Sequence, residues 1–553
     1  MKKLIALLLS LVMVMACGAF SLADEGSEPA WAEYDALIAQ IKSEPDFAVR
    51  EELMHKAEDI LMATAALCPI YYYNDIYLAK PELTGFYSNL YGMKYFHHAT
   101  NGDNTTIRLQ LASEPAKLDP ALNSSVDGAC LANAAFGGLY TYDENGMCVP
   151  NYATGYEVSE DGLTYTFTIR DGLVWSDGTP LTAKDFEYSW KRTANPETAA
   201  DYAYMMSGLE GYPDVNVAAS EDGKTFTVKL IAPCAYMLDL AAFPAFFAVQ
   251  EACVENAPDR ATNPGAWALE AGFVGSGPYV LESWEHNQSM VYVKNPLYWD
   301  AANVTNERLE FMLSDDDTAI YSAYQNGDLD FIDTVPTDQI ASLNGIDPEF
   351  HIIDNLGTYY SCFNVKSKLF DGKTVEQAAA MRKAFALLVD RQYIIDTVGQ
   401  TGQQIATSFI PAGMIDGNGG VFKSADEHTY PNGADGYFGT DVDVEGAVEL
   451  LKSAGFEFDA NNMLSASTPI SFEYLTNNTS GHVAIAECLQ QDFAAIGINM
   501  SIKSIDWAVF LNERKAGNFD VARNGWLADF NDPINMLEMW TTESGNNDVQ
   551  LGK

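Results

Sequence analysis

The segment Trp175-Ser-Asp-Gly-Thr-Pro-Leu-Thr-Ala-Lys-Asp-Phe186 joins a turn to the start of a helix. The Gly and Pro within it favour a turn. Thr182 is a good N-cap residue, and Asp185 follows it at the spacing of a capping box. We therefore expect a helix to begin just after Thr182. In this interpretation Trp175, Asp177 and Asp185 support the scaffold and do not bind a ligand.

Strand and turn patterns surround this segment. Residues 163–167 and 225–230 alternate between apolar and polar side chains, which is typical of strands. Asp143-Glu-Asn-Gly146 follows an aromatic run and predicts a hairpin turn. We expect this part of the chain to contain strands joined by short turns.

The last third of the chain alternates between helix and strand patterns. Helices are expected at 381–389, 445–454 and 482–496, and strands at 472–475 and 498–503. Gly455 and Gly497 follow two of these helices, where glycine commonly ends a helix. Such alternation predicts an α/β sheet with ligands at the strand ends.

The stretch Phe519-Asp-Val-Ala-Arg-Asn-Gly-Trp-Leu-Ala-Asp-Phe-Asn-Asp-Pro533 carries the strongest indication of a binding site. It opens as a buried strand and is expected to break at Gly525. Its charged and aromatic residues suit a zwitterion: Asp529 for an ammonium group, Arg523 for a carboxylate and Trp526 for packing. The alternative is a structural Arg–Asp pair at the end of a strand.

The composition is that of a large, acidic, globular protein. Its 553 residues exceed what one hydrophobic core holds, so two or three lobes are expected. A net charge of −46 argues against binding to nucleic acid or to an anionic membrane surface. The sequence lacks H-E-x-x-H, G-x-S-x-G and Cys-x-x-Cys motifs. We therefore expect no catalytic residues, no metal site and no cofactor.

These motifs resemble those of the extracellular solute-binding protein family 5, the oligopeptide- and dipeptide-binding proteins of bacterial ABC importers. The resemblance rests on residues 175–186 and on Ala522-Arg-Asn-Gly-Trp-Leu-Ala-Asp-Phe530, where the family has Tyr in place of Phe530. It implies an α/β fold of the periplasmic-binding-protein type, class II. That fold has two lobes, a hinge between them and an extra subdomain inserted in the first lobe.

The resemblance also assigns roles to residues of the 519–533 stretch. It implies that Asp529 holds the α-amino group of a peptide and that Arg523 helps with its carboxylate, while Trp526 packs nearby. Tyr202 and Tyr204 lie in the region that faces the ligand in the family, and which of them does so here stays open.

Further positions match ligand-contacting positions of the family. Trp507 would pack on the peptide and Tyr73 would form a hydrogen bond with it. Gly525 and Leu527 would offer backbone groups. Arg514 would lie near the far end of the ligand. Each of these side chains also has a purely structural interpretation, as core, sheet packing or surface charge.

The order of the segments departs from the family pattern. Residues 34–81 resemble the family's carboxy-terminal tail, whereas Thr106-Ile-Arg-Leu-Gln110 and Leu118-Asp-Pro120 resemble its mature amino terminus. We interpret the chain as a circular permutant joined through residues 100–105, because permutation is tolerated where the old ends lie close together. An error in gene assembly is the alternative.

The expected domains follow from this order. They are a signal peptide (1–23), the displaced tail (24–99, completing lobe 2 up to about residue 73 and then lobe 1), the start of lobe 1 (100–140), the inserted subdomain (141–275), the remainder of lobe 1 (276–358) and lobe 2 (359–553).

Residues 1–23 have the features of an export signal. Lys2 and Lys3 precede an apolar run, and Ser21-Leu-Ala23 fits a cleavage site. Val14-Met-Ala-Cys17 also fits a lipoprotein box, so a free form and a form lipidated at Cys17 both stay open. The protein is expected in the periplasm, outside the cell or on the outer face of the plasma membrane, which it would contact only through such an anchor.

The expected function is the capture of an oligopeptide or dipeptide by a monomer that is not an enzyme. The protein would deliver the peptide to the permease and ATPase subunits of an ABC importer. The alternatives are the same fold bound to a nickel complex, haem or a sugar, a peptide-pheromone receptor, and a secreted hydrolase. A sugar lacks the ammonium group that Asp529 would bind, which favours peptides.

Overall fold

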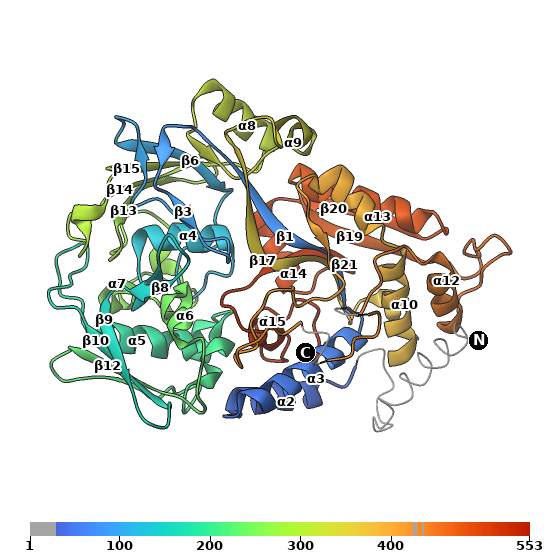
Figure 1. Cartoon of the computed structure of the whole chain (residues 1–553), viewed down its shortest axis with the longest axis horizontal. Coiled ribbons are helices and arrows are strands. Elements are labelled where there is room, and N and C mark those ends of the chain that lie inside the picture. The colour runs from blue at the N-terminus through green and yellow to red at the C-terminus, as the bar shows by residue number, and fades with distance from the viewer. Residues whose placement is uncertain (1–28, 424–427, 434–435) are drawn as a thin grey trace.

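The computed structural model describes residues 29–423, 428–433 and 436–553. The expected signal peptide and Cys17 lie outside these residues. Figure 1 shows two lobes joined by a pair of long strands near the centre of the molecule. Among the described residues, no helix combines the length and apolar character needed to cross a membrane.

One sheet of 11 strands runs through both lobes in the order β13-β14-β15-β6-β16-β1-β17-β21-β19-β20, with β18 added beside β1. The strands of the first lobe are β13 (Tyr279–Glu285), β14 (Ser289–Lys294), β15 (Arg308–Leu313), β6 (Thr106–Ala112) and β16 (Phe331–Ile332). Those of the second lobe are β21 (Val521–Leu527), β19 (Ser471–Asn477), β20 (Asn499–Ile505) and β18 (Gln404–Ile405).

The central strands are β1 (Leu67–Ala79) and β17 (Phe350–Phe363), which pair with each other in antiparallel fashion. One end of β1 pairs with β16 of the first lobe, and its middle pairs with β18 of the second lobe. The carboxyl-terminal half of β17 pairs with β21 of the second lobe. The β1–β17 register shifts at two places in the middle of β1, so the regular ladder is interrupted where the strands pass between the lobes.

Helices and small β-elements complete the first lobe. The helices are α4 (Val126–Ala135), α8 (Asp317–Asn326) and α9 (Thr337–Leu343), and the two-stranded pairs are β2 (Leu83–Thr84) with β5 (Thr100–Asn101) and β3 (Tyr87–Ser88) with β4 (Lys94–Tyr95).

A separate body of structure, which we call the insert, follows α4 in the chain. It holds the sheet β11-β12-β10-β9 and the hairpin β7-β8. Its elements are β7 (Tyr140–Tyr142), β8 (Cys148–Pro150), β9 (Ala153–Val158), β10 (Thr164–Ile169), α5 (Ala183–Ala194), β11 (Val217–Ala219), β12 (Thr225–Lys229), α6 (Met237–Ala242) and α7 (Glu251–Glu255).

The predicted capping box at Thr182 is confirmed, with Asp185 accepting from the Thr182 backbone N–H at 2.7 Å. Trp175 also donates to Asp185, at 3.3 Å.

The second lobe alternates strands and helices, as predicted. Its helices are α10 (Val375–Leu388), α11 (Arg391–Ile394), α12 (Val444–Ser453), α13 (Ser480–Ala494), α14 (Trp507–Lys515) and α15 (Ile534–Glu538). Strand β19 runs parallel to both β20 and β21, with α13 and α14 as the crossovers. This arrangement places the carboxyl ends of the three strands at one edge, where ligands bind in sheets of this type.

Two helices, α2 (Ala32–Ser43) and α3 (Phe47–Ala63), stand at the beginning of the described chain. They pack against the segment that contains α15. Tyr34 donates to the Leu537 carbonyl at 2.8 Å, and Arg50 forms two hydrogen bonds of 2.8 Å with Asp532. In Figure 1 both helices lie beneath α15, beside the red carboxy-terminal segment.

The insert is held to the first lobe by a buried ion pair. Arg192 of α5 binds both carboxylate oxygens of Asp119, and Trp267 donates to the same carboxylate at 2.8 Å.

Removing one partner of a buried pair leaves the other charge uncompensated. The Arg192→Met variant is therefore expected to lower the free energy of unfolding by about 3–5 kcal/mol in chemical denaturation. Its matched control is the adjacent, exposed Lys191, whose change to Met should stay within about 0.5 kcal/mol. Equal effects of the two variants would contradict this assignment.

Candidate functional site

A cavity of about 490 Å³ lies between the two lobes. Its walls come from β1, from α4 and neighbouring loops of the first lobe, from the insert and from the second lobe. The residues that the sequence singled out all line it: Asp529, Arg523, Trp507, Tyr73, Gly525, Leu527, Trp526 and Arg514. Residues separated by several hundred positions in the chain thus meet in one space.

Asp529 lies just beyond the end of β21 and is buried, with 8 % of its surface exposed. Its side chain accepts hydrogen bonds from Asn535 at 2.9 Å and from the Tyr202 hydroxyl at 3.2 Å. Both donors are neutral. None of the ion pairs among the described residues involves Asp529. Burial raises the pKa of this carboxyl to about 7, and the nearby Glu538 adds to the rise.

Asn535 of α15 fixes the geometry around this carboxylate. Its carbonyl oxygen accepts from the Asp529 backbone N–H at 3.0 Å and from the Trp526 indole at 3.1 Å. Its amide donates to the Asp529 side chain. One fully buried side chain therefore sets the positions of both residues. Its place close behind the Asn-Asp-Pro turn was the only signal of this role in the sequence.

Tyr202 is the tyrosine that faces the cavity, which answers the question the sequence left open. Its ring lies 5.9 Å from that of Trp526, and its hydroxyl reaches Asp529. Tyr204 does not line the cavity, and its hydroxyl accepts from Asn546 at 3.3 Å.

Arg523 is the second buried charge in the cavity, with 6 % of its surface exposed. Its Nε donates to the Asn477 side chain at 2.8 Å, and its guanidinium lies 5.1 Å from the centre of the Trp507 ring. No carboxylate among the described residues forms an ion pair with it. The alternative of a structural Arg523–Asp529 pair is therefore wrong. The cavity holds a buried cation and a buried anion that do not neutralise each other.

The strand that carries Arg523 does not break at Gly525, which corrects the sequence prediction. It continues in register with β17 to Leu527. Gly525 serves a different purpose, because a Cβ at this position would lie 2.0 Å from the Tyr73 hydroxyl. Its lack of a side chain allows Tyr73 to reach across the cavity floor. Tyr73 also meets Tyr71 and Tyr359 edge-to-face.

One further charge of the cavity wall, Arg514, is already neutralised. Arg514 forms an ion pair with Asp548 at 2.8 Å. His482, which sequence analysis did not select, lines the cavity beside Tyr359, and its ring stacks on that tyrosine at 5.5 Å. Burial and the neighbouring Arg523 lower the pKa of His482, which keeps it neutral.

The chain matches the model of the bacterial extracellular solute-binding proteins, family 5 Middle, over residues 148–548. The chain belongs to this family. It is 31 % identical over 459 residues to the oligopeptide-binding protein OppA of Bacillus subtilis, covering 80 % of this chain and 78 % of that protein. It is also 31 % identical over 450 residues to the dipeptide-binding protein DppE of the same organism, covering 79 % and 76 %.

The fold of this family-5 protein agrees with solved structures. Haemophilus influenzae OppA in complex with the peptide RPPGFSPFR is 27 % identical, with a TM-score of 0.69 over 81 % of this chain and 85 % of that one. The two-lobed, periplasmic-binding-protein-like fold predicted from the sequence is confirmed. The family consists of substrate-binding proteins.

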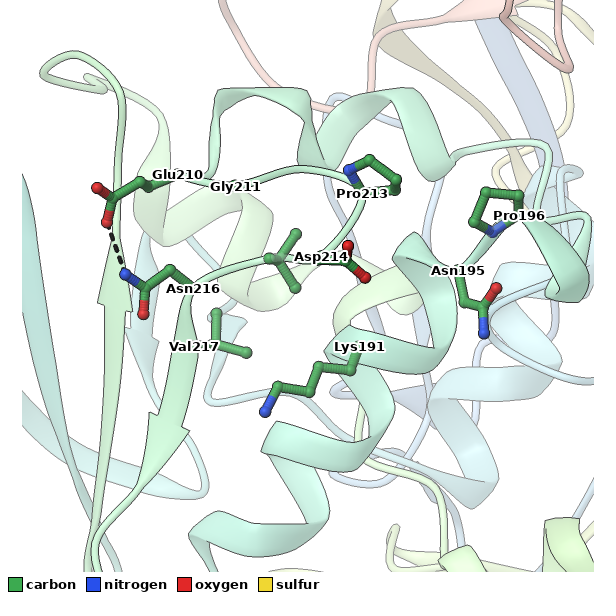
Figure 2. Close-up of a pocket in the computed structure, with 10 residues that line it drawn as sticks. Lys191, Asn195, Pro196, Glu210, Gly211, Pro213, Asp214, Asn216 and Val217 are labelled. Carbon is green, nitrogen blue, oxygen red and sulfur yellow. Dashed lines mark hydrogen bonds between the residues drawn. The ribbon is translucent and has the colours of Figure 1, made fainter.

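A second hollow of about 760 Å³ lies on the insert of this family-5 protein, between α5 and residues 210–217 (Figure 2). Its polar lining is exposed to solvent, and Asn216 already donates to Glu210 at 2.7 Å. None of the predicted site residues lies there. Because it contains no buried charge, we assign the functional site to the cavity between the lobes.

The raised pKa of Asp529 has a measurable effect on stability. Its folded-state pKa of about 7 lies above the ordinary value of 3.8, so this group makes the ligand-free protein less stable as the pH rises from about 4 to 7. The Asp529→Asn variant should remove the penalty and raise the free energy of unfolding by roughly 1–4 kcal/mol at pH 8, with little change at pH 4. Denaturation at both pH values tests this, with exposed Asp441→Asn as the control. A destabilised Asp529→Asn protein at pH 8 would contradict it.

Proposed function

We propose that this protein is the exported, non-enzymatic binding component of an ABC importer, and that it encloses an oligopeptide or dipeptide between its lobes. The observation that carries the proposal is the burial of Asp529 without a cationic partner. A buried carboxylate is costly unless it is paired. The α-ammonium group of a peptide would supply the missing charge and would join Tyr202 and Asn535 as a donor to Asp529.

Arg523 completes the match to a zwitterion. It presents a buried guanidinium that contacts neutral and aromatic groups only, and it would bind a carboxylate of the peptide. The peptide backbone would lie along the edges of the cavity between these two charges, with Trp507, Trp526 and Tyr73 against its side chains. Neutral solutes such as sugars would leave both charges unpaired.

The relatives support the same ligand class. Their names describe oligopeptide and dipeptide binding, and one solved relative contains a bound peptide. The permease and ATPase subunits of an ABC importer would then be the partners of this protein. A place outside the cytoplasm, either free or anchored through a lipid at Cys17, fits the export signal of the sequence.

Native mass spectrometry of the purified protein is expected to show bound short peptides, which can be identified after denaturation. Calorimetry with the most abundant peptide should then show at least a tenfold loss of affinity for Asp529→Asn, because a buried charge-assisted contact contributes about 1.5–3 kcal/mol. A copy of the peptide with an acetylated amino terminus should bind to the natural protein as weakly as the unmodified peptide binds to Asp529→Asn.

The same titration should depend on pH. As the pH falls below about 7, Asp529 of the free protein takes up a proton and no longer attracts an ammonium group, so affinity falls. Asp529→Asn should lose this dependence. Unchanged affinity of the acetylated peptide, or cleavage of the peptide over hours, would contradict the proposal.

We further propose that the chain is a circular permutant within its family. The relatives match about four fifths of this chain and a similar share of their own length, as expected when one segment is displaced. The ends that permutation would have opened are neighbours: Trp31 donates to the Trp540 carbonyl at 2.7 Å, and a Cβ on Gly552 would lie 3.0 Å from the Trp31 ring.

A reordered variant, in which residues 29–99 follow Lys553, tests this proposal. It should unfold at a similar temperature and bind the same peptide, because the join between Lys553 and residue 29 spans neighbouring positions. Long-read sequencing of the gene provides the genetic control. Contiguous DNA in the usual family order would contradict the permutation.

A further inference from the structure

Lys42 of α2 makes contacts on both sides of the boundary between the second lobe and the insert. Its ammonium group forms an ion pair with Glu538 of α15. It also donates to the Tyr204 carbonyl at 2.9 Å and to the Ser207 hydroxyl at 2.6 Å. The side chain is 6 % exposed. Three acceptors from two parts of the protein therefore satisfy one buried ammonium group.

The insert residues that Lys42 binds belong to a short segment, residues 201–207, which we call the bridging segment. Asp201 of this segment forms an ion pair with Lys515 at 3.2 Å. Tyr202 donates to Asp529, and Tyr204 accepts from Asn546. Every one of these partners lies in the second lobe. At its other side Asp201 accepts from Ser124 of the first lobe at 3.0 Å.

Contacts of this kind join the insert to the second lobe, so they would be lost if the lobes moved apart. When the second lobe moves away about β1 and β17, Lys515, Asp529 and Asn546 leave the bridging segment together. Lys42 would keep Glu538 and lose Tyr204 and Ser207, which lie on the opposite side. The geometry points to Lys42 as a positioning residue that locks the closed form around the ligand by tying α2 and α15 to the bridging segment.

The link to ligand binding runs through two neighbouring carboxylates. Glu538 is buried at 2 % exposure and faces Lys42, Arg50, Asp532, Tyr34, Tyr204 and Tyr236. Glu538 also raises the pKa of Asp529. By placing its positive charge beside Glu538, Lys42 limits the repulsion between Glu538 and an ionised Asp529. Lys42 therefore connects the bridging segment to the carboxylate next to the ammonium-binding Asp529.

Gly545 gives an independent way to disturb the same interface. A Cβ at this position would lie 2.5 Å from Asp201 Cα and 2.9 Å from the Asp201 carbonyl oxygen. The backbone of Gly545 lies outside the left-handed region, so its own loop accepts alanine. Gly545→Ala should thus leave the second lobe intact and hold it away from the bridging segment.

The test compares the natural full chain with Lys42→Met, Lys42→Arg and Gly545→Ala by small-angle X-ray scattering, with and without a pool of tripeptides. Lys42→Met and Gly545→Ala should have a larger radius of gyration in both conditions. Stopped-flow tryptophan fluorescence should show the pool dissociating about tenfold faster from them. Lys42→Arg should restore much of both, because it keeps the charge and the donors. Exposed Lys56→Met is the matched control.

This inference rests on the proposed function, and the two can fail separately. If both Lys42→Met and Gly545→Ala keep the radius of gyration and the peptide dissociation rate of the natural protein, the role of Lys42 is overturned. Peptide binding would still stand. Should Lys42→Met not fold, Gly545→Ala still decides the matter. If the natural protein does not bind the tripeptide pool, that result would count against peptide binding. A larger radius of gyration in the two variants would still support the role of Lys42 in holding the closed form.

Discussion

The pairing of β1 with β17 is the constraint on which the rest of the structure depends. These two strands run from one lobe to the other, and through them β16 of the first lobe and β21 of the second belong to one sheet. Their shared ladder is irregular in the middle of β1, beside the cavity. Tyr71 and residues 73–76 of β1 line that cavity. The connection between the lobes is therefore also the floor of the binding site, and a change in one alters the other.

Charge placement separates the scaffold from the site. Several buried charges of the protein are neutralised at short range, as in Arg192–Asp119, Arg50–Asp532 and Arg514–Asp548. Asp529 and Arg523 differ because they are buried with neutral partners only. A protein bears the cost of such charges where a ligand will compensate them. The presence of two such charges of opposite sign in one cavity is what makes the site recognisable.

Local patterns in the sequence gave reliable information where the structure itself is local. The capping box at Thr182 and the α/β alternation of the second lobe depend on neighbours in the chain, and both are present. The motif residues Asp529 and Arg523 also proved to line one cavity. The course of β21 beyond Gly525 was missed because its length is set by pairing with β17, a tertiary contact. Asn535 and Tyr202 were not assigned for the same reason, since their roles arise from side chains brought together only by folding.

The position of β1 in the sheet has a consequence for how the protein acquires its structure. This strand emerges early in synthesis, yet its neighbours β16, β17 and β18 lie between residues 331 and 405. Neither edge of the central strand can be satisfied until that distant part of the chain is available. Folding that waits for such remote pairings is slow. A slow-folding chain stays extended for longer, which suits the export that we propose for this protein.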